Sequence, residues 1–141
     1  MVSEIFYHPM NKSRKGAQWL FAGGSGLIYP DFIGIEPTNR IIADAKYKPF
    51  ANIANEDYLQ VLAYMYRFDA KKAYYFYPEI NDIADKVLQL NSGSSYEKNV
   101  RAREDIQIIK HGLHIPENAS SYTDFVDKIR KNEAEVRCKS E

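Results

Sequence analysis

The sequence predicts an α/β domain in which helices flank a mixed central β-sheet. Apolar segments with the length and composition of strands lie on both sides of a segment with helical periodicity. A helix between two strands is typical of a crossover that sets those strands parallel to each other. Because 141 residues are enough for one hydrophobic core, we expect a single domain over residues 1–141, with a sheet of about four to six strands.

Two short segments near the N-terminus are the first strand candidates. Ser3–Tyr7 has the composition of a short strand or of a truncated helix, and Ala17–Ala22 has that of a strand. Gly23–Gly26 follows, and it lacks the Lys-Ser or Lys-Thr pair of a phosphate-binding loop. We therefore interpret this glycine-rich segment as a hairpin turn that leads into the next strand.

A hairpin of two longer strands is expected over residues 27–35 and 40–47, which are rich in β-branched and other apolar residues. The residues between them, Glu36–Asn39, include a proline and an asparagine and have the composition of a turn. Counting outward from a four-residue turn sets Asp31 directly opposite Asp44 on one face. A register shifted by one residue would send the two carboxylates to opposite faces.

Opposed carboxylates destabilise an antiparallel pair unless another charge compensates them. A divalent cation would do so, because Asp31, Asp44 and the backbone carbonyl of Ala45 offer the hard oxygen ligands that Mg²⁺ prefers and that Mn²⁺ also accepts. Lys46 emerges on the same face, about 7 Å along the strand from Asp44. There it can contact a water or a phosphate oxygen held by the ion, so the pattern is typical of metal-dependent phosphodiester hydrolysis.

A helix is expected from about Asp57 to Phe68, because apolar side chains recur there with helical spacing on two faces. Asn55 precedes it and is the expected N-cap. Gln60 and Tyr64 are four residues apart and therefore share one face of this helix. We expect the helix to pack across the hairpin that carries the two aspartates.

The rest of the chain predicts three more strands and a final helix. Aromatic residues predict a strand over Ala73–Tyr77, ended by Pro78, and further strands are expected over Lys86–Leu90 and Glu104–Lys110. A final helix begins at a serine cap, residue 120 or 121. The tyrosines between residues 64 and 77 alternate with basic side chains, which suits stacking on single-stranded nucleic acid, but we favour their burial in the core.

A known family shows a similar pattern. Pro30-Asp31, twelve further residues and Asp44-Ala45-Lys46 resemble the PD-(D/E)XK motif of the restriction-endonuclease-like nuclease superfamily, and Gln60-x-x-x-Tyr64 resembles the helix motif that often follows it. The segments YPDFIGI, DAKYK and YLQVLAY are most similar to the McrC nuclease subunit of McrBC-type restriction systems. The resemblance covers about residues 25–78 and implies a restriction-endonuclease-like core.

The resemblance implies a magnesium-dependent DNA endonuclease of restriction or defence type. In it, Asp31, Asp44 and the Ala45 carbonyl hold the ion, and Lys46 positions the attacking water or stabilises the transition state. Gln60 and Tyr64 orient the lysine. DNA is the implied substrate, a nucleotide-hydrolysing motor subunit the implied partner, and a homodimer the implied form for cutting both strands of a duplex.

An alternative of another class is a catalytically inactive nuclease-fold module that serves as a binding or assembly piece of a larger complex. Superfamily members usually carry a further acidic ligand on a helix before the first core strand, and Glu4 is the only acidic residue upstream of Asp31. The chain is accordingly expected to be a short relative, a fragment, or the C-terminal part of a larger subunit.

Composition limits the remaining functional classes. Nineteen basic and nineteen acidic residues give a formal net charge of zero, so any DNA contact must come from local patches. The single cysteine, Cys138, excludes an internal disulfide. No apolar run approaches the length that spans a bilayer, so we expect a cytoplasmic protein without membrane contact.

Overall fold

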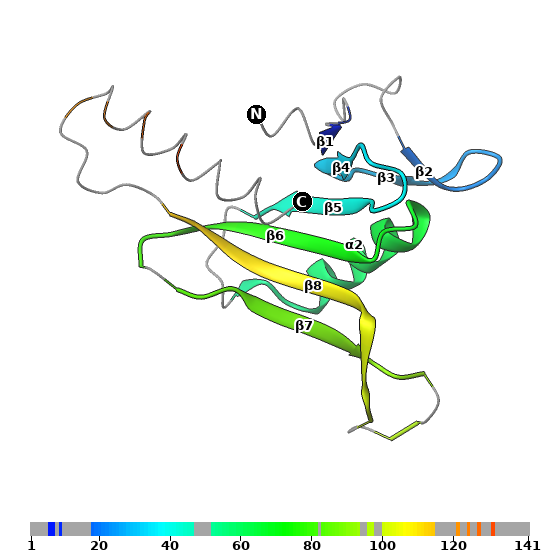
Figure 1. The fold of residues 1–141 in the computed structure, drawn as a ribbon. Coiled ribbons are helices and arrows are strands. Elements are labelled where there is room, and N and C mark those ends of the chain that lie inside the picture. Colours follow the sequence, from blue (N-terminus) through cyan, green and yellow to red (C-terminus); the bar gives the residue numbers. More distant parts are fainter. Residues whose placement is uncertain are drawn as a thin grey trace.

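The computed structural model describes residues 6–7, 9, 18–46, 52–81, 83–93, 96–97, 100–114, 121, 124, 127 and 131. These residues form a six-stranded mixed sheet, one complete helix against it, and a separate two-stranded sheet (Figure 1). The strands are β1 (Phe6–Tyr7), β2 (Gln18–Phe21), β3 (Ser25–Ile28), β4 (Phe32–Gly34), β5 (Ile41–Ala45), β6 (Lys72–Glu79), β7 (Lys86–Asn91) and β8 (Ala102–His114), and the helix is α2 (Asn55–Arg67).

The predicted mixed α/β architecture is confirmed. The main sheet has the strand order β1-β4-β5-β6-β8-β7, in which β5, β6 and β8 are parallel neighbours and the other pairs are antiparallel. Helix α2 connects β5 to the parallel strand β6, as the helix between two strand patterns predicts. No helix in the described part of the chain is long and apolar enough to cross a bilayer.

The main sheet is apolar on both faces, so its central strands are apolar at successive positions. On one face, Val61 and Met65 of α2 pack in a core cluster with Ile42 and Tyr75 of the sheet. On the other face, a second cluster of buried side chains contains Ile41, Ala43, Tyr74, Phe76 and Ile109. Burial on both sides makes β5 and β6 rigid supports for any side chain that follows them.

The register of the predicted hairpin is confirmed. Phe32 lies opposite Ala43 and Ile33 lies opposite Ile42 in the antiparallel pair of β4 and β5. The same register, continued by one position, sets Asp31 opposite Asp44 on the face that α2 covers. The turn composition at residues 36–39 is therefore enough to fix which side chains meet across this pair.

The single strand expected over residues 27–35 is wrong, because the chain changes partners in its middle. Its first part belongs to β3, which pairs with β2 in the two-stranded sheet, and its second part is β4 in the main sheet. Pro30 lies at the break and is buried. A proline offers no backbone N–H to a ladder, which allows the chain to leave one sheet and enter the other there.

Pro78 does not end β6, which continues to Glu79 with Pro78 opposite Leu113 of β8. The carbonyl of Phe76 accepts a hydrogen bond from the Lys46 N–H, so Phe76 directs its backbone groups toward β5. Residue 78 faces the same way two positions later, where β5 has already ended at Ala45. The missing N–H of Pro78 therefore removes no hydrogen bond between β5 and β6.

The predicted N-cap of α2 is one residue off. The N-cap is Ala54, and Asn55 is the first helical residue. Alanine has no side-chain acceptor, and the carboxylate of Asp57 instead reaches back to the Ala54 N–H at 3.0 Å. This contact is half of a capping box and fixes the orientation of Asp57.

The expected C-terminal helix is described only at a few positions. Asp124, Asp127 and Lys131 are helical, and the Asp124 N–H donates to the Ser121 hydroxyl at 3.1 Å, which is the geometry of an N-cap. The apolar stripe of that helix, Ser120, and the upstream acid Glu4 lie outside the described residues.

Replacing Gly34 with alanine should destabilise the β4–β5 pair. A Cβ at this position would lie 2.9 Å from the backbone nitrogen of Ile41 and 3.0 Å from its carbonyl oxygen. Because neither atom can move without shifting β5, we expect a loss of about 1–3 kcal/mol in the free energy of unfolding, measured by urea denaturation.

Gly93→Ala is the matched control, because nothing lies within 4 Å of a Cβ there. It should change the free energy of unfolding by less than about 0.5 kcal/mol. An equal loss in both variants would show that the close approach of β4 and β5 does not limit stability.

Candidate functional site

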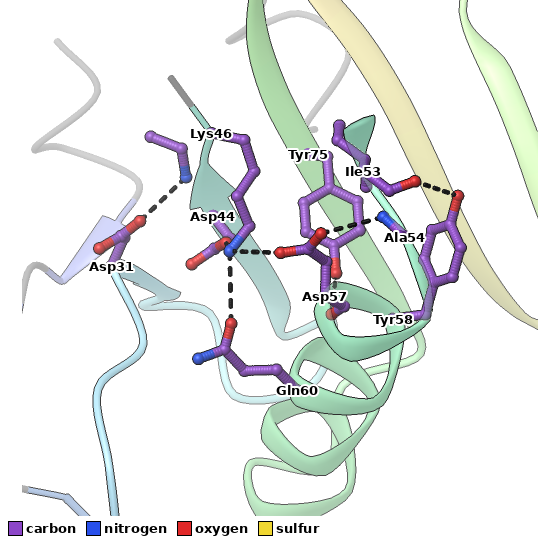
Figure 2. Close-up of polar contacts among 10 residues, drawn as sticks. Asp31, Asp44, Lys46, Ile53, Ala54, Asp57, Tyr58, Gln60 and Tyr75 are labelled. Atoms are coloured by element: carbon purple, nitrogen blue, oxygen red, sulfur yellow. Dashed lines mark hydrogen bonds and ion pairs between the residues drawn. The ribbon is translucent and has the colours of Figure 1, made fainter. Parts of the chain in front are cut away.

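The candidate site lies where β5 ends beside the first turns of α2 (Figure 2). Its centre is the ammonium group of Lys46, the residue after β5. The nitrogen lies 2.6 Å from Oδ2 of Asp44, 3.3 Å from Oδ1 of Asp57 and 3.3 Å from Oε1 of Gln60. One ammonium group is thus shared between a carboxylate of the sheet and two oxygen acceptors of the helix.

Asp31 completes the carboxylate pair from the segment that precedes β4. Its Oδ2 accepts a hydrogen bond from the Ala45 N–H at 2.9 Å, which holds the side chain against the end of β5 (Figure 2). Asp31 is also close enough to Asp44 that its charge and its hydrogen bond both raise the pKa of Asp44. The two carboxylates predicted to face each other therefore interact directly.

The electrostatic balance of this pair is unfavourable. Asp44 is only 5% exposed, and burial raises its pKa from the ordinary 3.8 to about 6. Lys46 opposes this shift by hydrogen bonding and by charge, whereas Asp31 adds to it. Because Asp44 remains harder to ionise than a free carboxyl even beside an ammonium group, the site still favours additional positive charge.

Lys46 is held as a cation. Burial alone would lower its pKa, but the hydrogen bonds and charges of Asp44 and Asp57 outweigh that effect and raise it. Its side chain is 16% exposed, so the ammonium group is still partly accessible. Lys46 can therefore donate hydrogen bonds to an anion, but it is unsuited to act as a general base.

The structure brings Gln60 and Tyr64 close to Lys46. Gln60 contacts Lys46 and also hydrogen-bonds the Tyr64 hydroxyl. That hydroxyl bonds the backbone of Tyr29 as well, and burial of the ring raises its pKa. Tyr64 stays protonated at neutral pH and connects α2 to the segment that carries Asp31.

Sequence reasoning missed Asp57 and Tyr75. Asp57 was expected only to begin the helix, yet it accepts from the Ala54 N–H with one oxygen and contacts the Lys46 ammonium group with the other. The Tyr75 hydroxyl donates to the Asp57 carbonyl, and the Lys46 nitrogen lies 5.8 Å from the centre of the Tyr75 ring. Asp57 stands three residues before Gln60, so a helix-face argument could have found it.

The site is one end of a row of side chains that crosses the sheet. Asp44 pairs with Tyr75, Tyr75 with Lys110 and Lys110 with Lys86 in the observed registers. The nitrogen of Lys110 lies 5.0 Å from the centre of the Tyr58 ring. The row therefore changes from acidic to basic across about 15 Å, three strand spacings.

The oxygen atoms of the site suit a hard cation that is bound partly through water. Among the residues described, no cluster of three or more Asp, Glu, His or Cys side chains could enclose a metal. Two carboxylates with backbone oxygen and water ligands are, however, the kind of open set that Mg²⁺ uses. Ala45 takes part through its N–H, and the role of its carbonyl as a ligand stays a prediction.

Comparisons with known proteins found no relative. No family model matches the chain, and neither curated proteins nor solved structures gave a similar protein.

Asp44→Asn should remove a pH dependence of stability. A carboxyl whose pKa is higher in the folded than in the unfolded chain stabilises the fold when protonated, so stability is lost as pH rises from about 4 through about 6. The shift corresponds to roughly 3 kcal/mol. Without divalent metal, Asn should therefore stabilise the protein at pH 7 and leave it little changed at pH 4, measured by urea denaturation.

Glu104→Gln, which changes an exposed carboxyl on β8, is the control and should keep the parental pH profile. If Asp44→Asn also keeps that profile, Asp44 does not carry the unfavourable charge assigned to it.

Proposed function

We propose that this protein is a magnesium-dependent DNA endonuclease of restriction or defence type, built on a restriction-endonuclease-like core. The observation that carries the proposal is the juxtaposition of Asp31 and Asp44 across β4 and β5, with the Lys46 ammonium group beside them. The similarity of residues 25–78 to McrC nuclease subunits supports the same class of enzyme.

In this proposal Asp31, Asp44 and the Ala45 carbonyl hold Mg²⁺ or Mn²⁺, which when bound polarises the scissile phosphate and lowers the pKa of an attacking water. Lys46 donates hydrogen bonds to that water or to the phosphate oxygens, where negative charge develops in the transition state. The partly exposed ammonium group is suited to this task because it remains protonated.

The contacts of Lys46 with α2 would keep its ammonium group in the site when Asp44 binds a metal ion in place of the lysine. Asp57 and Gln60 lie at equal 3.3 Å distances from the lysine nitrogen. The Tyr75 hydroxyl and the Ala54 N–H in turn hold Asp57. Asp57, Gln60 and Tyr64 are thus positioning residues that fix the lysine while the carboxylate pair is engaged.

Partners and location follow from the same proposal. DNA is the substrate, and double-strand cleavage would need two such sites, supplied by a homodimer or a partner-driven pair. A nucleotide-hydrolysing motor subunit fits the McrC resemblance, and base specificity would lie outside the matched region. A lone Cys138 suits the reducing cytoplasm.

A second candidate function is a catalytically inactive nuclease-fold module that binds or assembles. The 2.6 Å contact between Lys46 and Asp44 Oδ2 favours it, because the lysine occupies an oxygen that an ion would need. The two candidates differ in metal affinity. Calorimetric titration with Mg²⁺ or Mn²⁺ should show binding that Asp44→Ala abolishes, whereas no binding at millimolar metal would support the inactive module.

Lys46→Ala should separate chemistry from metal binding. Removing a positive charge beside the ion should leave Mg²⁺ affinity unchanged or slightly higher, while loss of transition-state stabilisation should slow DNA cleavage by roughly 100-fold or more. Cleavage is measured under single-turnover conditions, and affinity by calorimetry.

Lys71→Ala, at an exposed position before β6, is the matched control and should cleave at the parental rate. If Lys46→Ala also cleaved DNA at the parental rate, Lys46 would be an ordinary surface cation. The catalytic role proposed for the end of β5 would then be wrong.

A further inference from the structure

The two-stranded sheet exposes an apolar face. Trp19 pairs with Leu27 across the hairpin, and Phe21 pairs with Ser25. Trp19, Phe21 and Leu27 therefore point to one side, where they are 42%, 60% and 40% exposed, and Tyr29, directly after the end of β3, is 47% exposed. We call these four side chains the hairpin patch.

The opposite face of the hairpin anchors it to the domain. Ile28 is buried and Leu20 packs against the core cluster beneath α2. Arg67, at the end of α2, donates through Nε to the Trp19 carbonyl at 2.5 Å. The hairpin patch is thus displayed on a supported element rather than on a loose loop.

The hairpin patch is directly continuous with the candidate metal site. Only Pro30 separates Tyr29 from Asp31, and two residues of extended chain span about 7 Å. The Tyr64 hydroxyl bonds the Tyr29 backbone and Gln60, which in turn contacts Lys46. A DNA strand with a phosphate at Asp31 would therefore pass close to Tyr29, the member of the hairpin patch nearest in sequence to the site.

A second copy of this chain is a poor occupant. Four roughly half-exposed apolar side chains present about 400 Å², which is half of the about 800 Å² that each partner buries in a stable interface. Three of the four are aromatic, and aromatic faces stack on nucleic-acid bases with about 1–3 kcal/mol per base. The small area of the hairpin patch, together with its aromatic faces, therefore favours bases over a second copy of the chain.

We propose that the hairpin patch stacks on bases of the DNA strand whose phosphate occupies the Asp31–Asp44 site. The placement beside the scissile phosphate rests on the proposed function, whereas base stacking by the hairpin does not. Stacking would hold one or two unpaired or distorted bases next to the cleaved bond. The tyrosines of β6 cannot share this role, because Tyr74, Tyr75 and Tyr77 are buried.

Trp19 is the only tryptophan of the chain and lies in the hairpin patch, so its fluorescence reports contact directly. Titration of the non-cleaving Asp44→Asn variant with short single-stranded DNA should quench Trp19 emission and protect it from acrylamide. Phe21→Ser on the same background should weaken binding roughly tenfold. Tyr66→Ser removes a 92% exposed ring outside the hairpin patch and should bind normally.

The possible outcomes separate the stacking proposal from the nuclease proposal. DNA binding without quenching or protection of Trp19 overturns the stacking inference, even if Phe21→Ser fails to fold. Self-association of the parent that Phe21→Ser abolishes, with DNA affinity unchanged, overturns it in favour of a second copy. Quenching by DNA without any magnesium-dependent cleavage by the parent supports stacking and contradicts the nuclease proposal alone.

Discussion

The structure of the site depends on one electrostatic constraint, the meeting of two carboxylates across an antiparallel pair. The register of β4 and β5 places Asp31 beside Asp44, and burial makes the resulting charge costly. A single ammonium group, that of Lys46, compensates this charge only in part. The first two turns of α2 contribute from the other side, because Asp57 and Gln60 hold the ammonium group in place.

This arrangement links the stability of the fold to its proposed chemistry. Asp44 is buried in the sheet and is also part of the site. The negative charge of its carboxylate destabilises the fold because it is buried, and a bound cation would neutralise that same charge. Lys46 has alternative oxygen partners on α2 and can therefore remain nearby when Asp44 changes partner. The segment from Tyr29 to Asp31 extends the site to the hairpin patch, so catalysis and base contact would share one piece of backbone.

The elements that sequence could predict are those set by local rules. Turn composition with two-residue alternation was enough to predict that Asp31 faces Asp44, and helical spacing placed Gln60 and Tyr64 together. The break at Pro30 escaped prediction because apolar residues continue on both sides, and only pairing with β2 shows that the strand is divided. Asp57 shares a helix face with Gln60 and could have been found by that spacing, whereas the exposure of Phe21 depends on tertiary packing, which no local pattern encodes.

The central claim is that the carboxylate pair holds a divalent cation, and proton release on metal binding tests it most directly. An ion bound by Asp44 must displace the proton that this group retains below a pKa of about 6. Calorimetric titration with Mg²⁺ in buffers of different ionisation enthalpy should therefore show release of a substantial fraction of a proton near pH 6 and almost none at pH 8. Metal binding that releases no proton at either pH, or that persists unchanged in Asp44→Asn, would contradict the account.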